Sequence, residues 1–154
     1  RNLKLSSRGL DYKVSFEATH HGPYLGTPAF FIEIGSDEGC WQEESAGRAI
    51  AEAILSIKPE REPIAIGVGG GHYAPRMTDV ALECRLSFGH IIPSYALRDI
   101  KEEMLEKAVE KTSGAENVYF HRKAMRKSQY RELKVWFEEH GLVPLRQKDI
   151  GSRQ

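Results

Sequence analysis

The sequence has 154 residues, 40% of them hydrophobic and 29% charged, which is typical of a globular protein with one ordinary hydrophobic core. Its 22 Lys and Arg residues balance its 22 Asp and Glu residues. This balance argues against a protein whose main task is to grip DNA or other nucleic acid through a surplus of positive charge. No apolar run approaches the roughly 20 residues of a membrane span. Cys40 and Cys84 match no disulfide or zinc-ribbon spacing, so we expect two reduced thiols in a cytoplasmic protein.

Hydrophobic periodicity predicts that strands and helices alternate along the chain. The opening stretch, Arg1–Asp11, is polar and has no helical period. In chain order, the pattern then predicts strands at Tyr12–Ala18 and Ala29–Ile34, a helix within Trp41–Ile57, a strand at Ile64–Val68, a helix at Thr78–Cys84, a strand at Leu86–Ile92, a helix at Ala96–Lys111, a strand at Asn117–His121, a helix at Met125–His140 and a strand at Leu142–Leu145.

This order of elements predicts a single α/β domain over residues 1–154, with a mostly parallel or mixed sheet flanked by helices. In such sheets, ligands bind beyond the carboxyl ends of the strands. Candidate functional residues should therefore follow predicted strands. The first residue is Arg rather than Met, and we expect the chain to be the C-terminal part of a longer protein.

The first group of candidates ends the strand predicted at Tyr12–Ala18. On a regular strand Glu17, Thr19 and His21 share the polar face, and His20 points to the other side. A carboxylate beside imidazoles is the pairing that orients a catalytic base or binds zinc. For an anonymous pair of adjacent histidines, hydrogen bonds within a turn are the more common explanation, and Glu17 shifts the balance towards function.

The second group follows the buried strand predicted at Ile64–Val68. Gly69, Gly70 and Gly71 let the backbone pass close to a ligand and present N–H groups to an anion. His72, Tyr73 and Arg76 come directly after them, whereas a dinucleotide or P-loop motif would need other residues there. A tight strand-to-helix turn would need fewer glycines, so the segment favours a functional site.

Two further candidates lie inside predicted strands. Glu33 interrupts an apolar strand, where burial makes a charged carboxylate costly unless something pairs with it; a salt bridge or an exposed edge is an equal alternative. His90 follows Gly89, which permits close approach, and is either a site residue or a core histidine bonded to backbone.

A basic stretch occupies Arg122–Lys134, in which Glu132 is the only acidic residue. Lys123, Lys127, Arg131 and Lys134 have the spacing of one helical face. A solvated helix surface is the usual explanation for such a face, and contact with an RNA backbone is the alternative.

Four blocks of the sequence together resemble the D-aminoacyl-tRNA deacylases of archaea and plants: FEATHHGP at Phe16–Pro23, FIEIGS at Phe31–Ser36, IGVGGGHYAPR at Ile66–Arg76 and FGHIIP at Phe88–Pro93. The resemblance implies hydrolysis of the ester between a D-amino acid and the tRNA 3′ end. It also implies a requirement for zinc, a monomer, and an α/β fold similar to peptidyl-tRNA hydrolases and nucleoside phosphorylases.

For that reaction we expect water to attack directly, because the sequence has no Gly-x-Ser-x-Gly elbow and no plausible cysteine nucleophile. His20, His21 and His72, with Glu17 or Glu33, are expected to orient this water or to hold it on zinc. The N–H groups of Gly69–Gly71 are expected to stabilise the oxyanion. The remaining substrate-binding candidates are Arg76 for the terminal phosphate or ribose, Tyr73 for the terminal adenine, Thr19 and His90.

Two other functions remain open at this point. One is a peptidyl-tRNA hydrolase-like amide hydrolase, which would act on N-blocked substrates. The other is a non-catalytic module that binds the end of tRNA without cleaving an ester.

Overall fold

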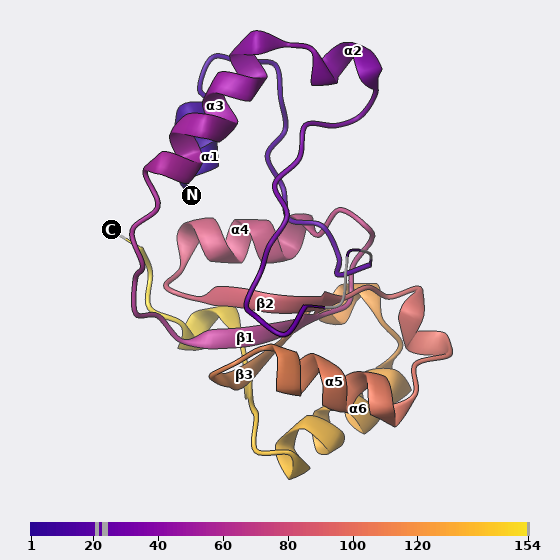
Figure 1. Ribbon diagram of the computed structural model, residues 1–154. Coiled ribbons are helices and arrows are strands. Elements are labelled where there is room, and N and C mark those ends of the chain that lie inside the picture. Colours follow the sequence, from indigo (N-terminus) through magenta and orange to yellow (C-terminus); the bar gives the residue numbers. More distant parts are fainter. Residues whose placement is uncertain (21, 23–24, 154) are drawn as a thin grey trace. The chain divides into compact units, whose positions relative to one another are not determined.

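The structure, a computed structural model, describes residues 1–20, 22 and 25–153 (Figure 1). Contacts group the chain into two units. The N-terminal unit comprises Arg1–Val14 and Pro23–Arg61, and the sheet unit comprises Ser15–Gly22 and Glu62–Gln154. None of the helices in the described part of the chain has the length and apolar character needed to cross a bilayer.

The sheet unit is built on four parallel strands in the order β2-β1-β3-β4. Helices follow the strands in alternation, as the periodicity predicts. In chain order its elements are β1 (Ile64–Val68), α4 (Pro75–Glu83), β2 (Ser87–Ile92), η1 (Ala96–Arg98), α5 (Glu102–Lys111), β3 (Ala115–Phe120), η2 (Arg122–Ala124), α6 (Lys127–Glu139), β4 (Val143–Leu145) and η3 (Gln147–Asp149).

Helix α4 covers one face of this sheet, and α5 and α6 cover the other (Figure 1). The alternation of side chains along each strand supplies both faces. In β1, Ile66 and Val68 pack with the apolar residues of α5 and α6, whereas Ala65 packs with Val80 of α4. Because both faces are covered, the central strand β1 is a continuous apolar run, as is usual in parallel sheets. The predicted α/β class with helices flanking a parallel sheet is confirmed.

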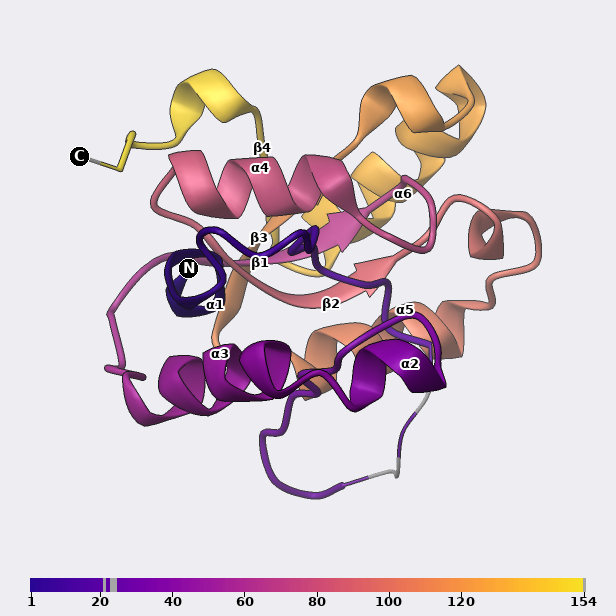
Figure 2. The ribbon, with the colours of Figure 1, turned by 90° about the horizontal axis from the view of Figure 1, so that it is seen from above.

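The chain leaves β1 and β3 towards opposite faces of the sheet, because α4 follows β1 and α6 follows β3. Adjacent parallel strands that diverge in this way mark the position where α/β sheets bind ligands. In Figure 2 the chain can be followed beyond the arrowhead of β2. The candidate site is therefore expected at this carboxyl edge.

The predicted strand Ile64–Val68 has the observed bounds of β1, and the later predicted strands and the helix within Trp41–Ile57 agree within a few residues. The helix predicted at Ala96–Lys111 is divided into η1 and α5. Two predicted strands, Tyr12–Ala18 and Ala29–Ile34, are wrong. A strand needs a partner strand. Neither segment belongs to the sheet, and within the two segments only Glu17 forms an isolated bridge.

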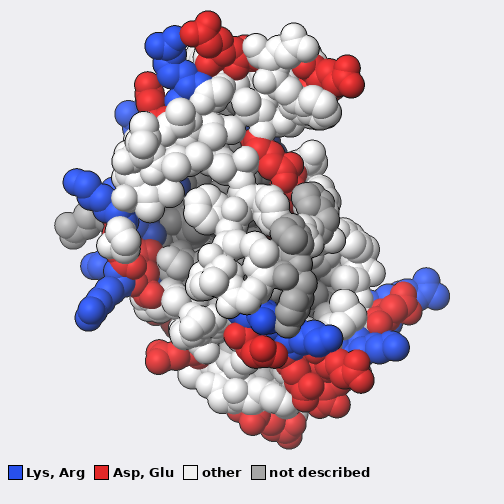
Figure 3. Space-filling view, in the orientation of Figure 1, with Lys and Arg blue, Asp and Glu red and all other residues white. Residues whose placement is uncertain are grey.

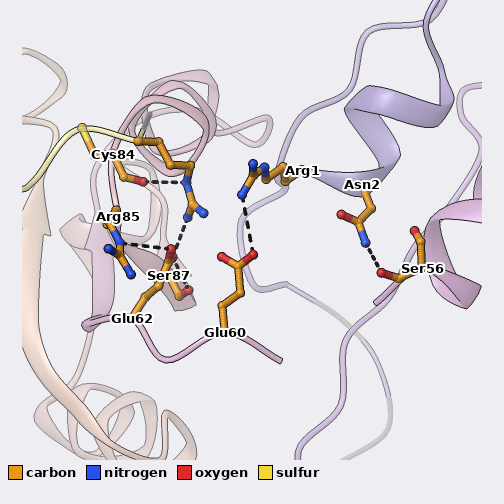
Figure 4. Close-up of polar contacts among 9 residues, drawn as sticks. Arg1, Asn2, Ser56, Glu60, Glu62, Cys84, Arg85 and Ser87 are labelled. Atoms are coloured by element: carbon orange, nitrogen blue, oxygen red, sulfur yellow. Dashed lines mark hydrogen bonds and ion pairs between the residues drawn. The ribbon is translucent and has the colours of Figure 1, made fainter. Parts of the chain in front are cut away.

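The N-terminal unit contains three helices in its described residues: α1 (Asn2–Ser6), α2 (Glu38–Trp41) and α3 (Glu44–Leu55). Helix α1 was not predicted, since the opening residues are mostly polar. The Asn2 side chain donates a hydrogen bond to the Ser56 carbonyl, 2.8 Å away, and so joins α1 to the end of α3 (Figure 4). Helix α3 buries a stripe of small side chains at helical spacing: Ala46, Ala49 and Ala53.

An ion pair and a hydrogen bond hold the C-terminal segment of the sheet unit beside the start of β2. Only 3% of the Glu62 side chain is exposed, and its carboxylate pairs with Arg153 and Arg85 (Figure 4). Arg153 also donates to the Cys84 carbonyl. These contacts lie at the edge opposite the carboxyl ends of the strands, so they serve the fold. In the lower part of Figure 3, where this unit lies, basic and acidic side chains are interspersed.

Candidate functional site

The segment Phe16–Thr19 is held in place by backbone hydrogen bonds to the turn after β1. Ala18 N–H donates to the His72 carbonyl at 2.7 Å, and Ala74 N–H donates to the Phe16 carbonyl at 2.9 Å. Thr19 N–H donates to the Ile91 carbonyl at the end of β2. This pairing brings two parts of the sequence that are more than fifty residues apart to the same edge of the sheet.

Glu17, His20 and His72 form a cluster as a result. Their ligand atoms all lie within 4.8 Å of one another. One carboxylate oxygen of Glu17 lies 3.9 Å from His20 Nε2, and the other lies 3.9 Å from His72 Nε2. The two imidazole rings meet edge to face with centroids 4.3 Å apart. The side chains are 27 to 41% exposed, so the cluster is reachable from solvent.

The protonation of His20 follows from its hydrogen bond. Its Nδ1 lies 2.5 Å from the Ala18 carbonyl oxygen. A carbonyl oxygen can only accept, so Nδ1 carries the proton and the neutral ring has its lone pair on Nε2. That nitrogen faces Glu17, and a lone pair of this kind can act as a base or a metal ligand.

The glycines after β1 serve close packing as well as the site. Gly69 and Gly70 have positive φ angles of 96° and 98°, a conformation that favours glycine. Gly69 N–H donates to the Ile92 carbonyl, and Gly70 N–H donates to Ser94 Oγ, both at 2.8 Å. These two N–H groups are therefore occupied within the fold, whereas Gly71 N–H makes no recorded hydrogen bond to any described residue. The role of Gly71 as an oxyanion donor stays a prediction.

Tyr73 and Arg76 have different environments. The Tyr73 side chain is exposed and meets the His72 ring edge to face, with centroids 5.2 Å apart. Arg76 is half-buried on α4, where its Nε donates to the Tyr119 hydroxyl and its Nη2 to the Gln147 side chain. Its guanidinium thus holds the C-terminal segment to the sheet, and a second role towards a substrate phosphate stays a prediction.

Thr19 and His90 lie at β2, beside the cluster rather than in it. Thr19 Oγ1 accepts a hydrogen bond from Ile91 N–H at 3.1 Å. His90 turns towards α5, where its Nδ1 lies 2.9 Å from Thr112 Oγ1. Burial lowers the pKa of His90 below its usual range. Of the two alternatives weighed for this residue, these contacts favour a packed structural histidine.

Two predicted site residues are not placed at the cluster by this geometry. His21 lies outside the described residues. Glu33 belongs to the N-terminal unit, where it is exposed and not part of a strand.

His121 lies close to the site, although the sequence pattern suggested no role for it. It follows β3, and its N–H donates to the Val68 carbonyl at the end of β1. Its Nδ1 is buried without a hydrogen-bond partner among the described residues, close to where a side chain on Gly70 would begin. Burial, with Arg76 and Lys123 nearby, lowers the pKa of His121. The one available sign in the sequence is its position directly after a buried strand.

Both lowered histidine pKa values predict that the chain loses stability in mild acid. The unfolded chain takes up these protons near pH 6.5, while the folded chain resists them to lower pH. The free energy of unfolding should therefore fall as the pH drops through 6.5 and stop falling below the folded pKa values. The slope of the free energy of unfolding against pH should be a fraction of the roughly 1.4 kcal/mol per pH unit that uptake of one whole proton on unfolding would give, because both rings are partly exposed. Urea unfolding from pH 8 to pH 5 would measure it, and His90→Asn should flatten it; an unchanged slope in that variant would contradict the assignment.

Comparison with known proteins shows the family of this chain. Residues 1–144 match the family model described as D-aminoacyl-tRNA deacylase. A relative of that name from Methanosarcina acetivorans is 45% identical over 147 residues, covering 95% of this chain and 49% of the relative. A relative of the same name from Pyrococcus furiosus is 44% identical over 137 residues, covering 86% of this chain and 50% of the relative. The chain thus spans about half the length of these curated relatives.

A solved structure is similar over nearly the whole chain. It is a crystal structure described as a conserved protein of unknown function, with a TM-score of 0.87 and 31% sequence identity. The match covers 99% of this chain and 58% of the other.

Proposed function

Because the chain belongs to the D-aminoacyl-tRNA deacylase family, we propose that this protein hydrolyses the ester between a D-amino acid and the 3′ end of tRNA. The products are free tRNA and the D-amino acid, so the reaction removes wrongly charged tRNA before translation uses it. Since charged tRNA is found where proteins are made, we propose that the enzyme acts in the cytoplasm.

The single observation that carries the proposed chemistry is the cluster of Glu17, His20 and His72. Ester hydrolysis by water needs a group that removes a proton from the water as it attacks. His20 Nε2 has a lone pair for this purpose, and the Glu17 carboxylate 3.9 Å away stabilises the imidazolium that forms. His72, which faces the other oxygen of the same carboxylate, is the second base within reach. Cys84 is buried, and neither cysteine belongs to the cluster, so we propose no cysteine nucleophile.

The same three side chains fit the zinc that the family resemblance implies. Two imidazoles and one carboxylate are a known ligand set of catalytic zinc, which leaves a fourth position for water. Their ligand atoms lie within 4.8 Å of one another, so one small cation could contact all three. Zinc bound there would take up the lone pairs of His20 and His72, so it would replace the histidine base, and it would lower the pKa of a bound water towards 7. The proton on His20 Nδ1, held by the Ala18 carbonyl, keeps Nε2 directed at the shared position.

Residues around the cluster suit the rest of an aminoacyl ester. We propose that Gly71 N–H donates to the developing oxyanion, a contribution worth roughly 3 kcal/mol for one donor. We also propose that the Tyr73 ring, which is exposed, stacks on the terminal adenine. The D and L esters carry the same groups, so preference for the D form must come from steric exclusion of one side-chain direction.

The test is hydrolysis of D-tyrosyl-tRNA, L-tyrosyl-tRNA and N-acetyl-D-tyrosyl-tRNA by the same preparation. We expect the D ester to be cleaved faster than the L ester by on the order of 100-fold. Equal rates for D and L would contradict the proposal, and preference for the N-acetylated substrate would indicate a peptidyl-tRNA hydrolase-like enzyme instead. Binding of tRNA without any ester cleavage would indicate a non-catalytic module.

Removal of metal tests the zinc assignment separately. Treatment with a chelator should abolish hydrolysis of D-tyrosyl-tRNA, and added zinc should restore it. Elemental analysis should find about one zinc per chain in the unmodified protein and much less in Glu17→Gln. Full activity in a preparation that contains no metal would leave the histidines as the only base and contradict the zinc assignment.

A further inference from the structure

A hollow of about 570 Å³ lies beside the turn after β1, between the segment that follows β2 and the start of α6. Its volume is within the range of about 300 to 1,000 Å³ that is common for ligand sites. The charged and polar residues that line it are Ser94, Tyr95, Arg98, Lys123, Arg126 and Gln129. Three of these are cationic and none is acidic.

The three cations of this hollow are not neutralised by partners in the part of the chain that the structure describes. Arg98, Lys123 and Arg126 are exposed, and no ion pair of theirs is recorded among the described residues. Other members of the basic stretch differ. Arg122 lies over the Tyr130 ring, 4.4 Å from its centroid, and Lys134 pairs with Glu138 at 2.6 Å.

The walls of the hollow are fixed relative to each other. The Gln129 side chain accepts a hydrogen bond from Arg126 N–H and donates one to the Leu97 carbonyl. Ser94 Oγ donates to the Ala124 carbonyl. A preformed group of cations loses less side-chain entropy when it binds an anion. Helix α6, which has 13 residues, also begins here and adds the positive end of its dipole.

The hollow lies next to the glycine turn of the site, because Ser94, which lines the hollow, is hydrogen-bonded to Gly70. Ser94 Oγ accepts from Gly70 N–H, and Ser94 N–H donates to the Gly70 carbonyl, both at 2.8 Å. His72 lies two residues beyond Gly70, so its Cα is at most about 7 Å from that of Gly70. The hollow is therefore within reach of the nucleotides that precede an ester bound at the cluster.

We propose that this hollow binds a phosphodiester of the single-stranded 3′ end of tRNA, next to the aminoacylated nucleotide. Arg98, Lys123 and Arg126 pair with the phosphate, and the Tyr95 ring, which is 60% exposed, supplies a stacking surface for a neighbouring base. The inference rests on the proposed function, because it takes the ester-bearing end of tRNA as the ligand. The balanced net charge is consistent with it, since three local cations are enough for one or two phosphates.

The kinetic test compares Lys123→Gln/Arg126→Gln with Lys107→Gln, a control that removes one exposed positive charge from α5. For D-tyrosyl-tRNA, KM should rise about tenfold in the double variant, with kcat unchanged. For the ester of D-tyrosine with adenosine, which has no phosphate, the double variant should match the unmodified chain. An unchanged KM for tRNA, or the same loss with both substrates, would overturn the inference.

A binding test does not depend on catalysis. Fluorescence anisotropy of 5′-labelled single-stranded RNA ending in CCA should show about tenfold weaker binding by the double variant, and the slope of log K against log salt should be smaller by about 1 to 2. Equal affinity would overturn the inference even if the ester is hydrolysed, and weaker binding would support it even if no ester is hydrolysed. Displacement of the RNA by AMP at an equal concentration would identify the hollow as a mononucleotide site and overturn the RNA assignment.

Discussion

His72→Ala is expected to lower kcat/KM for D-aminoacyl-tRNA by at least about 100-fold, and His20→Ala should have an effect of the same order. Each variant removes one of the two imidazoles that face the Glu17 carboxylate. Neither side chain belongs to the hydrophobic core, and the backbone bonds between Ala18 and His72 remain. The melting temperature should therefore change by only a few degrees. Single-turnover deacylation and thermal unfolding followed by circular dichroism measure the two quantities.

His140→Ala is the matched control for this experiment. His140 is exposed at the end of α6, where its ring stacks on Trp136 with centroids 3.8 Å apart. It has the same side chain as the two cluster residues and lies outside the site, so its rate should stay within about twofold of the unmodified chain. Rates near that of the unmodified chain for both His20→Ala and His72→Ala would remove the cluster from the proposed mechanism. In the variant that carries both His20→Ala and His72→Ala, the loss of kcat/KM should differ from the product of the two single losses, because the two rings act as one unit.

The sheet could be predicted from the sequence because its strands and helices carry apolar side chains where they pack against one another. Ile64–Val68 is a short apolar run that ends at glycines, and its bounds were predicted correctly. The residues before it were predicted less well. The alternation in Tyr12–Ala18 imitates a strand, yet Phe16–Thr19 finds its hydrogen-bond partners in a turn and at the end of β2. Periodicity indicates which side chains are apolar, but it does not indicate which backbone segments will form hydrogen bonds with each other.

The candidate site was only partly predictable for the same reason. Glu17, His20 and His72 were all named from their types and positions. Their meeting depends on the hydrogen bond from Ala18 to His72, a long-range pairing that no local pattern encodes. The basic stretch shows a related limit: Lys123 lies in η2, before α6 begins, and so is not on the helical face that its spacing suggested. Arg98, its neighbour in the hollow, comes from a separate part of the sequence.

Gly89→Ala is expected to destabilise the fold by about 1 to 3 kcal/mol. A Cβ on Gly89 would lie 2.2 Å from Thr112 Cγ2 and 2.9 Å from its Oγ1. Thr112 is buried and cannot turn away without loss, because its hydroxyl donates to the Ala108 carbonyl and accepts from His90 N–H. Thermal unfolding should show a fall of roughly 3 to 10 °C for a chain of this size.

Thr112→Ser separates the steric clash from other effects of the alanine. Serine keeps the hydroxyl and its hydrogen bonds, and it removes the methyl group that the new Cβ at position 89 would strike. The φ angle of Gly89 is not in the positive region, so backbone strain is not a competing cause. The loss of stability from Gly89→Ala should therefore be smaller in the Thr112→Ser background, by an amount above the roughly 0.5 kcal/mol that independent sites show. Equal losses in both backgrounds would mean that the methyl group does not cause the effect.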